Sequence, residues 1–414
     1  MRLFLHHVPP CCMQIVLHLI EAKPEWRAGP ANKLLASMLV PSMSGYVWDE
    51  LCRSRKTGPM RGLYVLIEML DSQGKKHLLS GQPPSLQLIT LASINPEGVA
   101  VLTGKPIKKL MIAIMAVLGD EQTSLHCKEN AAWILRRVTE GDAAKPLFAG
   151  SRDHLMIISK MLSGEYRGCE APTVETIGSP NDEQASPTRA ISAEKSQVAV
   201  ASVSKTHDST ASAADNEEIA SPIAAKSSHL QELSFTGMAN TGVAFASDVE
   251  RCAIEGNCCL ALAQSALKDE LLERLGSTKG ILNGLIHVLS NGTEWAAGNA
   301  ARALANIAYR PENLGSFVTL IDESMRENLV SGLSQLAKDK MRLSCKRFSA
   351  LCIANLAANE VLLMKFLTFK GLKEDLLLMQ KINDPAVATE ASRAVLILNQ
   401  ARFGTISWRQ PKRI

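Results

Sequence analysis

The amino-acid sequence predicts an all-α fold, a helical solenoid in which one unit repeats along the chain. Three observations support this prediction. Only 4% of the 414 residues are aromatic although 46% are hydrophobic, and aromatic and β-branched residues are the ones that strands prefer. Similar apolar segments recur at a nearly constant spacing. A polar segment interrupts the series without disturbing the spacing of the segments on either side.

The polar segment comprises residues 163–247. It includes 14 Ser but only two Leu, and its 5 basic against 11 acidic side chains give a net charge of −6. Such a composition buries too little apolar surface to offset the entropy lost on ordering. We therefore expect a disordered acidic insertion between two helical regions, residues 85–162 and 248–400. Residues 1–84 are expected to form degenerate or capping helical repeats, and residues 401–414 a basic tail.

The repeated segment has small residues at its second or third position, an aliphatic anchor at its sixth and a polar residue at its eighth. Clear copies begin at Asn130, Asn257, Asn299 and Phe348, and the anchors of all six copies are Leu91, Leu135, Leu262, Leu304, Ile353 and Val395. Within each helical region the sequence numbers of successive anchors differ by 42 to 49. The interval from Leu135 to Leu262 is longer, and it exceeds 42 by the length of the segment 163–247.

A second apolar run precedes the anchors and locates the insertion within one unit. Gly280 and Gly371 each begin such a run, at the same distance before the anchors Leu304 and Val395. Gly150 begins the same kind of run, which then enters the insertion. We therefore expect the insertion in the loop between the last two helices of one repeat, where long loops are tolerated.

A helical period of about 40–47 residues is typical of armadillo and HEAT arrays. The segment Ser277–Ser290 followed by Asn299–Ala308 resembles the second and third helices of an armadillo unit, and Glu129–Leu135 is similar. The resemblance is to a generic armadillo-repeat protein, and not a close match to importin alpha. It implies a right-handed α-solenoid that acts as a non-enzymatic protein-binding scaffold or adaptor.

In armadillo proteins the third helices line a concave face that grips an extended peptide or helix, and a recurrent asparagine hydrogen-bonds the peptide backbone. The resemblance thus implies seven candidate binding residues: Trp133, Arg137, Gln264, Asn299, Arg302, Asn306 and Asn355. The alternative is that these amides cap or brace neighbouring helices. On the groove interpretation, replacing Asn306 by Ala should weaken peptide binding but barely change the melting temperature.

The basic character of the helical regions favours an acidic peptide as the ligand. A basic stripe is a hypothesis that rests on Arg136, Arg137, Arg302, Arg310, Lys346 and Arg347. The acidic insertion could then cover the same groove. Importin alpha carries a row of Trp and an acidic groove, whereas this chain keeps Trp133 with Arg137 at the asparagine position. Two alternatives stay open: a karyopherin-like nuclear transport receptor, or a regulatory subunit of a ubiquitin-ligase or chaperone assembly.

Other function classes lack support in the sequence. A net charge of +4 is too small to indicate a nucleic-acid binder. The segment Gly98–Pro106 has five residues between its glycines and a proline after its lysine, so it is not a phosphate-binding loop. We expect no enzyme activity, cofactor or metal. The apolar run Cys11–Ile20 is too short to cross a membrane. Ten cysteines without a Cys-x-x-Cys pair indicate reduced thiols, so we expect a cytoplasmic location, a nuclear location or both. We also expect a monomer.

Overall fold

The structure, a computed structural model, describes residues 84–94, 96–164 and 244–402. Every element within these ranges is an α-helix. Three predicted segments fall largely or wholly outside them: the N-terminal repeats over 1–84, most of the insertion and nearly all of the basic tail.

The described helices form groups of three, after one helix that precedes the first group. In chain order they are α5 (Pro84–Ile94); α6 (Pro96–Leu102), α7 (Ile107–Gly119) and α8 (Leu125–Val138); α9 (Ala144–Ala149), α10 (Arg152–Leu162) and α12 (Ala244–Ser265); α13 (Asp269–Ser277), α14 (Lys279–Asn291) and α15 (Glu294–Ile307); α16 (Pro311–Thr319), α17 (Glu323–Ala337) and α18 (Leu343–Leu356); and α19 (Glu360–Thr368), α20 (Leu372–Met379) and α21 (Pro385–Arg402).

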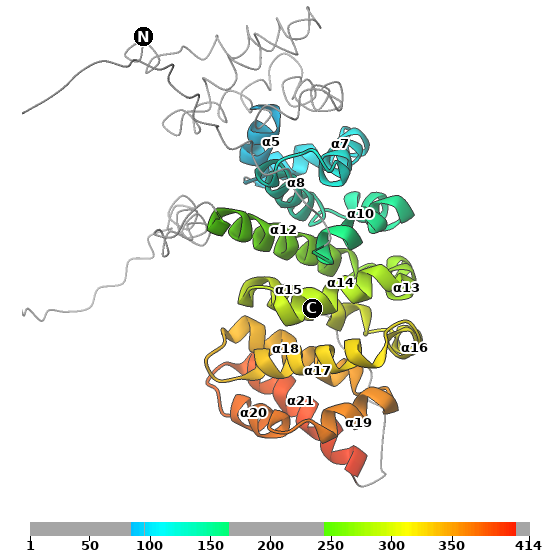
Figure 1. Cartoon of the computed structure of the whole chain (residues 1–414), viewed down its shortest axis with the longest axis vertical. Coiled ribbons are helices and arrows are strands. Elements are labelled where there is room, and N and C mark those ends of the chain that lie inside the picture. Colours follow the sequence, from blue (N-terminus) through cyan, green and yellow to red (C-terminus); the bar gives the residue numbers. More distant parts are fainter. Residues whose placement is uncertain (1–83, 95, 165–243, 403–414) are drawn as a thin grey trace, which may run out of the picture. The chain divides into compact units, whose positions relative to one another are not determined.

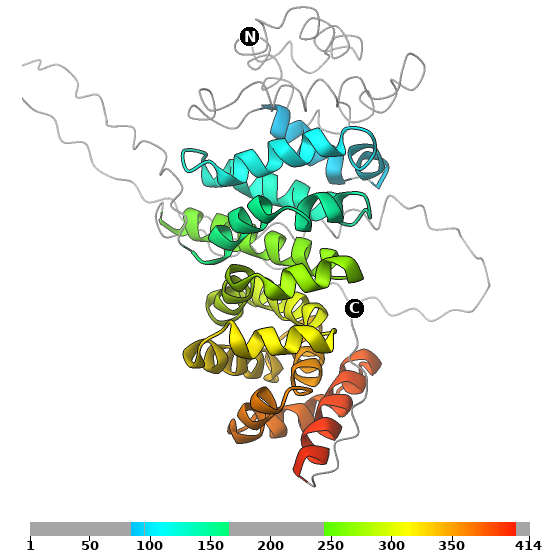
Figure 2. The ribbon, with the colours of Figure 1, turned by 90° about the vertical axis from the view of Figure 1, so that its right-hand side faces the viewer.

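Corresponding helices of successive groups pack side by side. The third helices form one row, in which each of α5, α8, α12, α15, α18 and α21 contacts the next. The second helices α7, α10, α14, α17 and α20 form another row. Figures 1 and 2 show the groups following one another in layers from α5 to α21. Three-helix units stacked in this way are the architecture of an armadillo-type α-solenoid, which confirms the predicted fold class.

The insertion falls between α10 and α12 in the chain. Helix α10 is the second helix of its group and α12 is the third, so residues 165–243 interrupt a single unit, at the position expected from the anchor spacing. Helix α12 begins at Ala244, whereas composition assigned residues up to 247 to the insertion. The Ala-rich stretch 244–247 suits a helix as well as a polar segment, which explains the difference.

Local signals in the sequence determine where several helices begin. The side chains of Ser124 and Thr293 accept hydrogen bonds from the backbone N–H groups of the first turns of α8 and α15, and Asp322 does the same for α17. Such caps satisfy N–H groups that have no partner within the helix. Gly371 precedes α20 with φ +88°, a left-handed conformation that glycine adopts without strain.

The core runs continuously along the third helices. The anchors Leu135, Leu262, Leu304 and Ile353 are fully buried, as the repeat pattern predicts. Gly256 lets neighbouring third helices approach closely, because a Cβ at that position would overlap the ring of Trp295. Buried cysteines also fill this core: burial raises the pKa of Cys258 to about 12 and that of Cys345 to about 11. At such values both are neutral thiols that pack as small apolar residues.

Candidate protein-binding surface on the third helices

The residues predicted to bind a peptide all lie on third helices, but they differ in accessibility. Asn306 and Asn355 are fully buried, and Asn299 is 7% exposed. Trp133, Arg137, Gln264 and Arg302 are half-buried. We call the accessible side of α8, α12, α15, α18 and α21 the third-helix surface.

The two asparagines connect neighbouring third helices. The Nδ2 atom of Asn306 donates to the carbonyl oxygen of Ala263 at 3.0 Å, and Nδ2 of Asn355 donates to that of Ala305 at 2.8 Å. Both carbonyls lie in the last turn of a helix, where carbonyl groups have no intrahelical donor. The backbone N–H of Leu267, four residues after Ala263, donates to Gln264 instead. Each asparagine therefore caps the helix of the preceding repeat.

Arg137 and Gln264, which occupy the same position in their repeats, make similar connections. Arg137 Nε donates to the carbonyl oxygen of Ser93 in α5 at 2.9 Å, and its Nη1 pairs with Glu140. Gln264 Oε1 accepts a hydrogen bond from Thr139 Oγ1 at 2.7 Å. All four position-eight side chains thus brace adjacent repeats, which is the alternative that the sequence left open. A peptide that bound the Asn306 or Asn355 Nδ2 groups would have to replace these braces.

A cluster of aromatic and guanidinium groups lies at the α8, α12 and α15 end of this surface. The guanidinium of Arg136 lies 4.8 Å from the ring centroid of Trp133 and 5.9 Å from that of Trp295. Its Nη1 also donates to Asn257 Oδ1 at 3.5 Å. The indole rings fix the orientation of the guanidinium group, and the N–H groups at its edge can still donate hydrogen bonds to a ligand.

A second such group lies between α15 and α18. The guanidinium of Arg302 lies 5.4 Å from the ring centroid of Phe348. Burial lowers the pKa of Arg302, and the positive charge of Arg347 lowers it further. Burial and a neighbouring positive charge both disfavour the charged form of a guanidinium group.

Three donors near these groups are buried and have no acceptor among the described residues: Trp133 Nε1, Asn299 Nδ2 and Arg347 Nε. Leaving a buried N–H without an acceptor costs about 1–3 kcal/mol. Trp133 and Asn299 were candidates from the sequence, and Arg347 was named there only in the hypothetical basic stripe, whereas Trp295 and Phe348 were not singled out as binding residues. An acceptor supplied by a ligand would recover part of this cost once the covering side chains moved.

Sequence reasoning did not select Arg393 on α21, which contacts a side chain of the preceding third helix, α18. Its Nη2 donates to Asn355 Oδ1 at 2.7 Å, and its Nη1 lies 3.4 Å from Glu390 Oε2. Arg393 stands at the fourth position of the sixth repeat copy, the position of Trp133 and Arg302 in theirs. Aligning the repeat copies would therefore have identified Arg393 as a candidate, because it occupies the same position as two residues that were selected.

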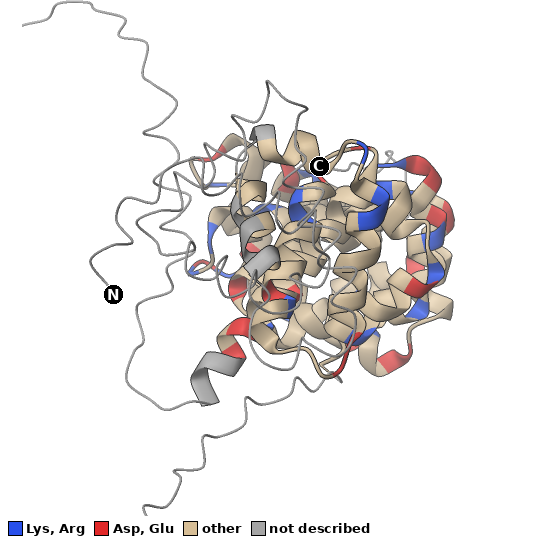
Figure 3. Cartoon of the chain, turned by 90° about the horizontal axis from the view of Figure 1, so that it is seen from above, with Lys and Arg blue, Asp and Glu red and all other residues tan. Residues whose placement is uncertain are grey.

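Two members of the hypothetical basic stripe lie apart from these groups. Lys346 is 4% exposed and donates to the backbone oxygen of Asp339 at 2.7 Å. Arg310 is the N-cap residue of α16, a first helix. Figure 3 shows Lys and Arg interspersed with Asp and Glu along the right-hand edge of the helices, the side on which Figure 1 places first and second helices such as α10 and α16. The six residues of the hypothetical basic stripe therefore do not lie together on the third-helix surface.

Comparisons with known proteins concern the architecture. No protein-family model and no curated protein matches the chain. A designed armadillo repeat protein is 17% identical, with a TM-score of 0.47, and the match covers 81% of this chain and 100% of that one. A designed armadillo repeat protein in complex with the peptide (KR)4 is 16% identical, covering 81% and 99%, with a TM-score of 0.44. UNC-45 from Drosophila melanogaster is 15% identical with a TM-score of 0.22, and the match covers 96% of this chain and 59% of UNC-45. The fold assignment rests on the three-helix units themselves.

The length and hydropathy of the helices bear on membrane association. Among the helices within the described ranges, none is both long and apolar enough to cross a bilayer.

Proposed function

We propose that this chain is a non-enzymatic protein-binding scaffold, and that its third-helix surface binds an extended acidic segment of a partner protein. One observation carries the proposal: arginines on two third helices, α8 and α15, are held against aromatic rings, with Arg136 over two indoles and Arg302 over Phe348. The designed protein in complex with (KR)4 shares the architecture but takes a basic peptide. The charge of the ligand proposed for this chain is the opposite.

The chemistry of the guanidinium group supports an acidic ligand. Its planar set of N–H donors matches a carboxylate and can bind it through two parallel hydrogen bonds. Because Arg136 and Arg302 already rest on aromatic rings, little side-chain freedom remains to be lost on binding. A carboxylate placed between Arg302 and Arg347 would also relieve the repulsion between their charges.

An anisotropy titration tests the proposal with the full-length chain. A fluorescein-labelled octaglutamate peptide is the probe, and a lysine–arginine peptide of equal length is the comparison. We expect the octaglutamate to bind more tightly and its affinity to fall with added salt. Replacing Arg347 by Ala removes one charge-assisted contact worth about 1.5–3 kcal/mol, so the affinity should fall roughly tenfold or more.

The matched control is Arg152→Ala, because Arg152 is an exposed arginine at the start of the second helix α10. It should bind the octaglutamate as the unaltered chain does. Equal losses in the Arg152 and Arg347 variants would show that only net charge matters. A preference for the lysine–arginine peptide would contradict the proposal and favour a karyopherin-like receptor for basic cargo.

The acidic insertion is a further candidate ligand, since it carries its net charge of −6 on the same chain. We propose that it competes with external acidic peptides. A chain lacking residues 167–241 should then bind the octaglutamate more tightly than the full-length chain, whereas an unchanged affinity would exclude this competition.

A further inference from the structure

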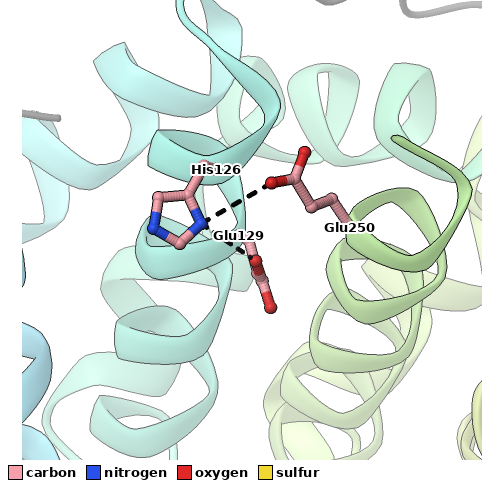
Figure 4. A group of neighbouring side chains, drawn as sticks. All are labelled: His126, Glu129 and Glu250. Carbon is pink, nitrogen blue, oxygen red and sulfur yellow. Dashed lines mark hydrogen bonds and ion pairs between the residues drawn. The ribbon is translucent and has the colours of Figure 1, made fainter. Parts of the chain in front are cut away.

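Three side chains capable of metal coordination converge at the start of two neighbouring third helices. His126 and Glu129 lie one turn apart on α8, and Glu250 lies near the start of α12. Nδ1 of His126 is 3.4 Å from Glu129 Oε2 and 3.7 Å from Glu250 Oε1. Figure 4 shows the imidazole pointing between the two carboxylates. We call these residues the His126 cluster.

The spacing within the His126 cluster suits a small divalent cation. Its three ligand atoms lie within 4.8 Å of one another. In a tetrahedral zinc site, metal–ligand distances of about 2.0–2.2 Å place neighbouring ligand atoms about 3.4 Å apart. The separations between the imidazole nitrogen and the carboxylate oxygens are close to this value. We propose that the His126 cluster binds Zn²⁺ through His126 Nδ1 and one oxygen of each glutamate, with water as the fourth ligand.

The electrostatics of the cluster favour a cation. The charge of Glu129 helps to raise the pKa of Glu250, after burial, which is the main cause. Within the described residues, neither carboxylate forms an ion pair with a lysine or arginine. His126 is the positive partner when protonated, and its pKa is raised chiefly by its hydrogen bond to Glu129. Zn²⁺ would take the place of this proton, which leaves to solvent, and would supply two charges instead of one.

The cluster is accessible, since the side chains of His126, Glu129 and Glu250 are 48%, 32% and 29% exposed. It also has a defined structural consequence. Glu250 lies six residues after the first residue of α12, the helix that follows the insertion, while the other two ligands lie in the preceding repeat. A metal bound here would join the third helix of the interrupted unit, which follows the insertion, to the third helix of the preceding repeat.

Equilibrium dialysis of the full-length chain with ZnCl₂ tests the proposal. We expect one saturable Zn²⁺ site that is lost, or weakened at least tenfold (roughly the effect of losing even an outer-shell partner), in each of His126→Gln, Glu129→Gln and Glu250→Gln. Sites formed by cysteines elsewhere in the chain would appear equally in all variants. The matched controls are Glu312→Gln and His287→Gln, which remove a carboxylate and an imidazole outside the cluster.

Hydrogen exchange supplies a second measurement. It reports whether Zn²⁺ itself stabilises the start of α12, which a cluster that only braces the two helices would not show. Zn²⁺ should slow exchange in the first turns of α12 in the unaltered chain and should have no effect on the Glu250→Gln chain. The proposal is overturned if the three cluster variants retain the stoichiometry and affinity of the unaltered chain. It is equally overturned if Zn²⁺ leaves the exchange of residues 244–255 unchanged.

Discussion

Replacing Asn306 by Ala separates the two interpretations of the recurrent asparagine. If Asn306 only faced a peptide, the substitution would leave stability nearly unchanged. The structure instead places its side chain at 0% exposure, with Nδ2 donating to the carbonyl oxygen of Ala263 at 3.0 Å. The substitution would remove this donor from a buried carbonyl that has no intrahelical partner.

The expected loss of stability comes from leaving the carbonyl group of Ala263 without a hydrogen-bond donor. A buried acceptor left without a partner costs about 1–3 kcal/mol, and the space left by the amide adds to the loss. We therefore expect Asn306→Ala to lower the free energy of unfolding by at least about 1 kcal/mol. Because each repeat contacts only its neighbours, the effect should be largest at the interface between α12 and α15.

Urea denaturation followed by far-ultraviolet circular dichroism measures the total effect, and hydrogen exchange of α12 and α15 locates it. The matched control is Asn291→Ala, because Asn291 is exposed at the end of a second helix. That control should stay within the roughly 0.5 kcal/mol typical of surface substitutions. A loss equally small for Asn306→Ala would refute the brace and restore the groove interpretation.

Two further predictions concern α12. Gly256→Ala places a Cβ against the Trp295 ring, so overpacking should lower stability by about 1–3 kcal/mol in urea denaturation. Gly315→Ala, where a Cβ meets nothing within 4 Å, is the control and should not destabilise the chain. The second prediction concerns pH. Burial raises the pKa of Glu255 from 4.5 to about 7, so the folded chain holds this proton to higher pH than the unfolded chain does. Stability due to Glu255 should therefore fall as the pH rises from 4.5 to about 7. Glu255→Gln should remove that fall in the urea midpoint while Glu312→Gln keeps it, and an unchanged fall in the Glu255 variant would contradict the assignment.

The periodic features of the molecule could be read directly from the sequence. Anchors such as Leu304 and Ile353 recur because every repeat must bury the same apolar positions against the next one. The length of the insertion appears in the spacing between Leu135 and Leu262, because a helix cannot shift along its neighbour without exposing its anchor. The repeat register and the interrupted unit are therefore consequences of burial that a pattern of apolar residues records.

The direction and partners of the polar side chains were not available from the same pattern. Asn306 has the same place in its repeat whether its amide faces a groove or a neighbouring carbonyl, because a helical position specifies a face but not a hydrogen-bond partner. Likewise, Arg136 contacts Trp295 and His126 contacts Glu250, although the insertion separates the two residues of each pair in the sequence. These contacts depend on how closely adjacent helices pack, which is set by residues such as Gly256. The linear order of the residues specifies the repeat, and the packing of one repeat on the next decides which of its polar groups brace the stack and which are left to bind.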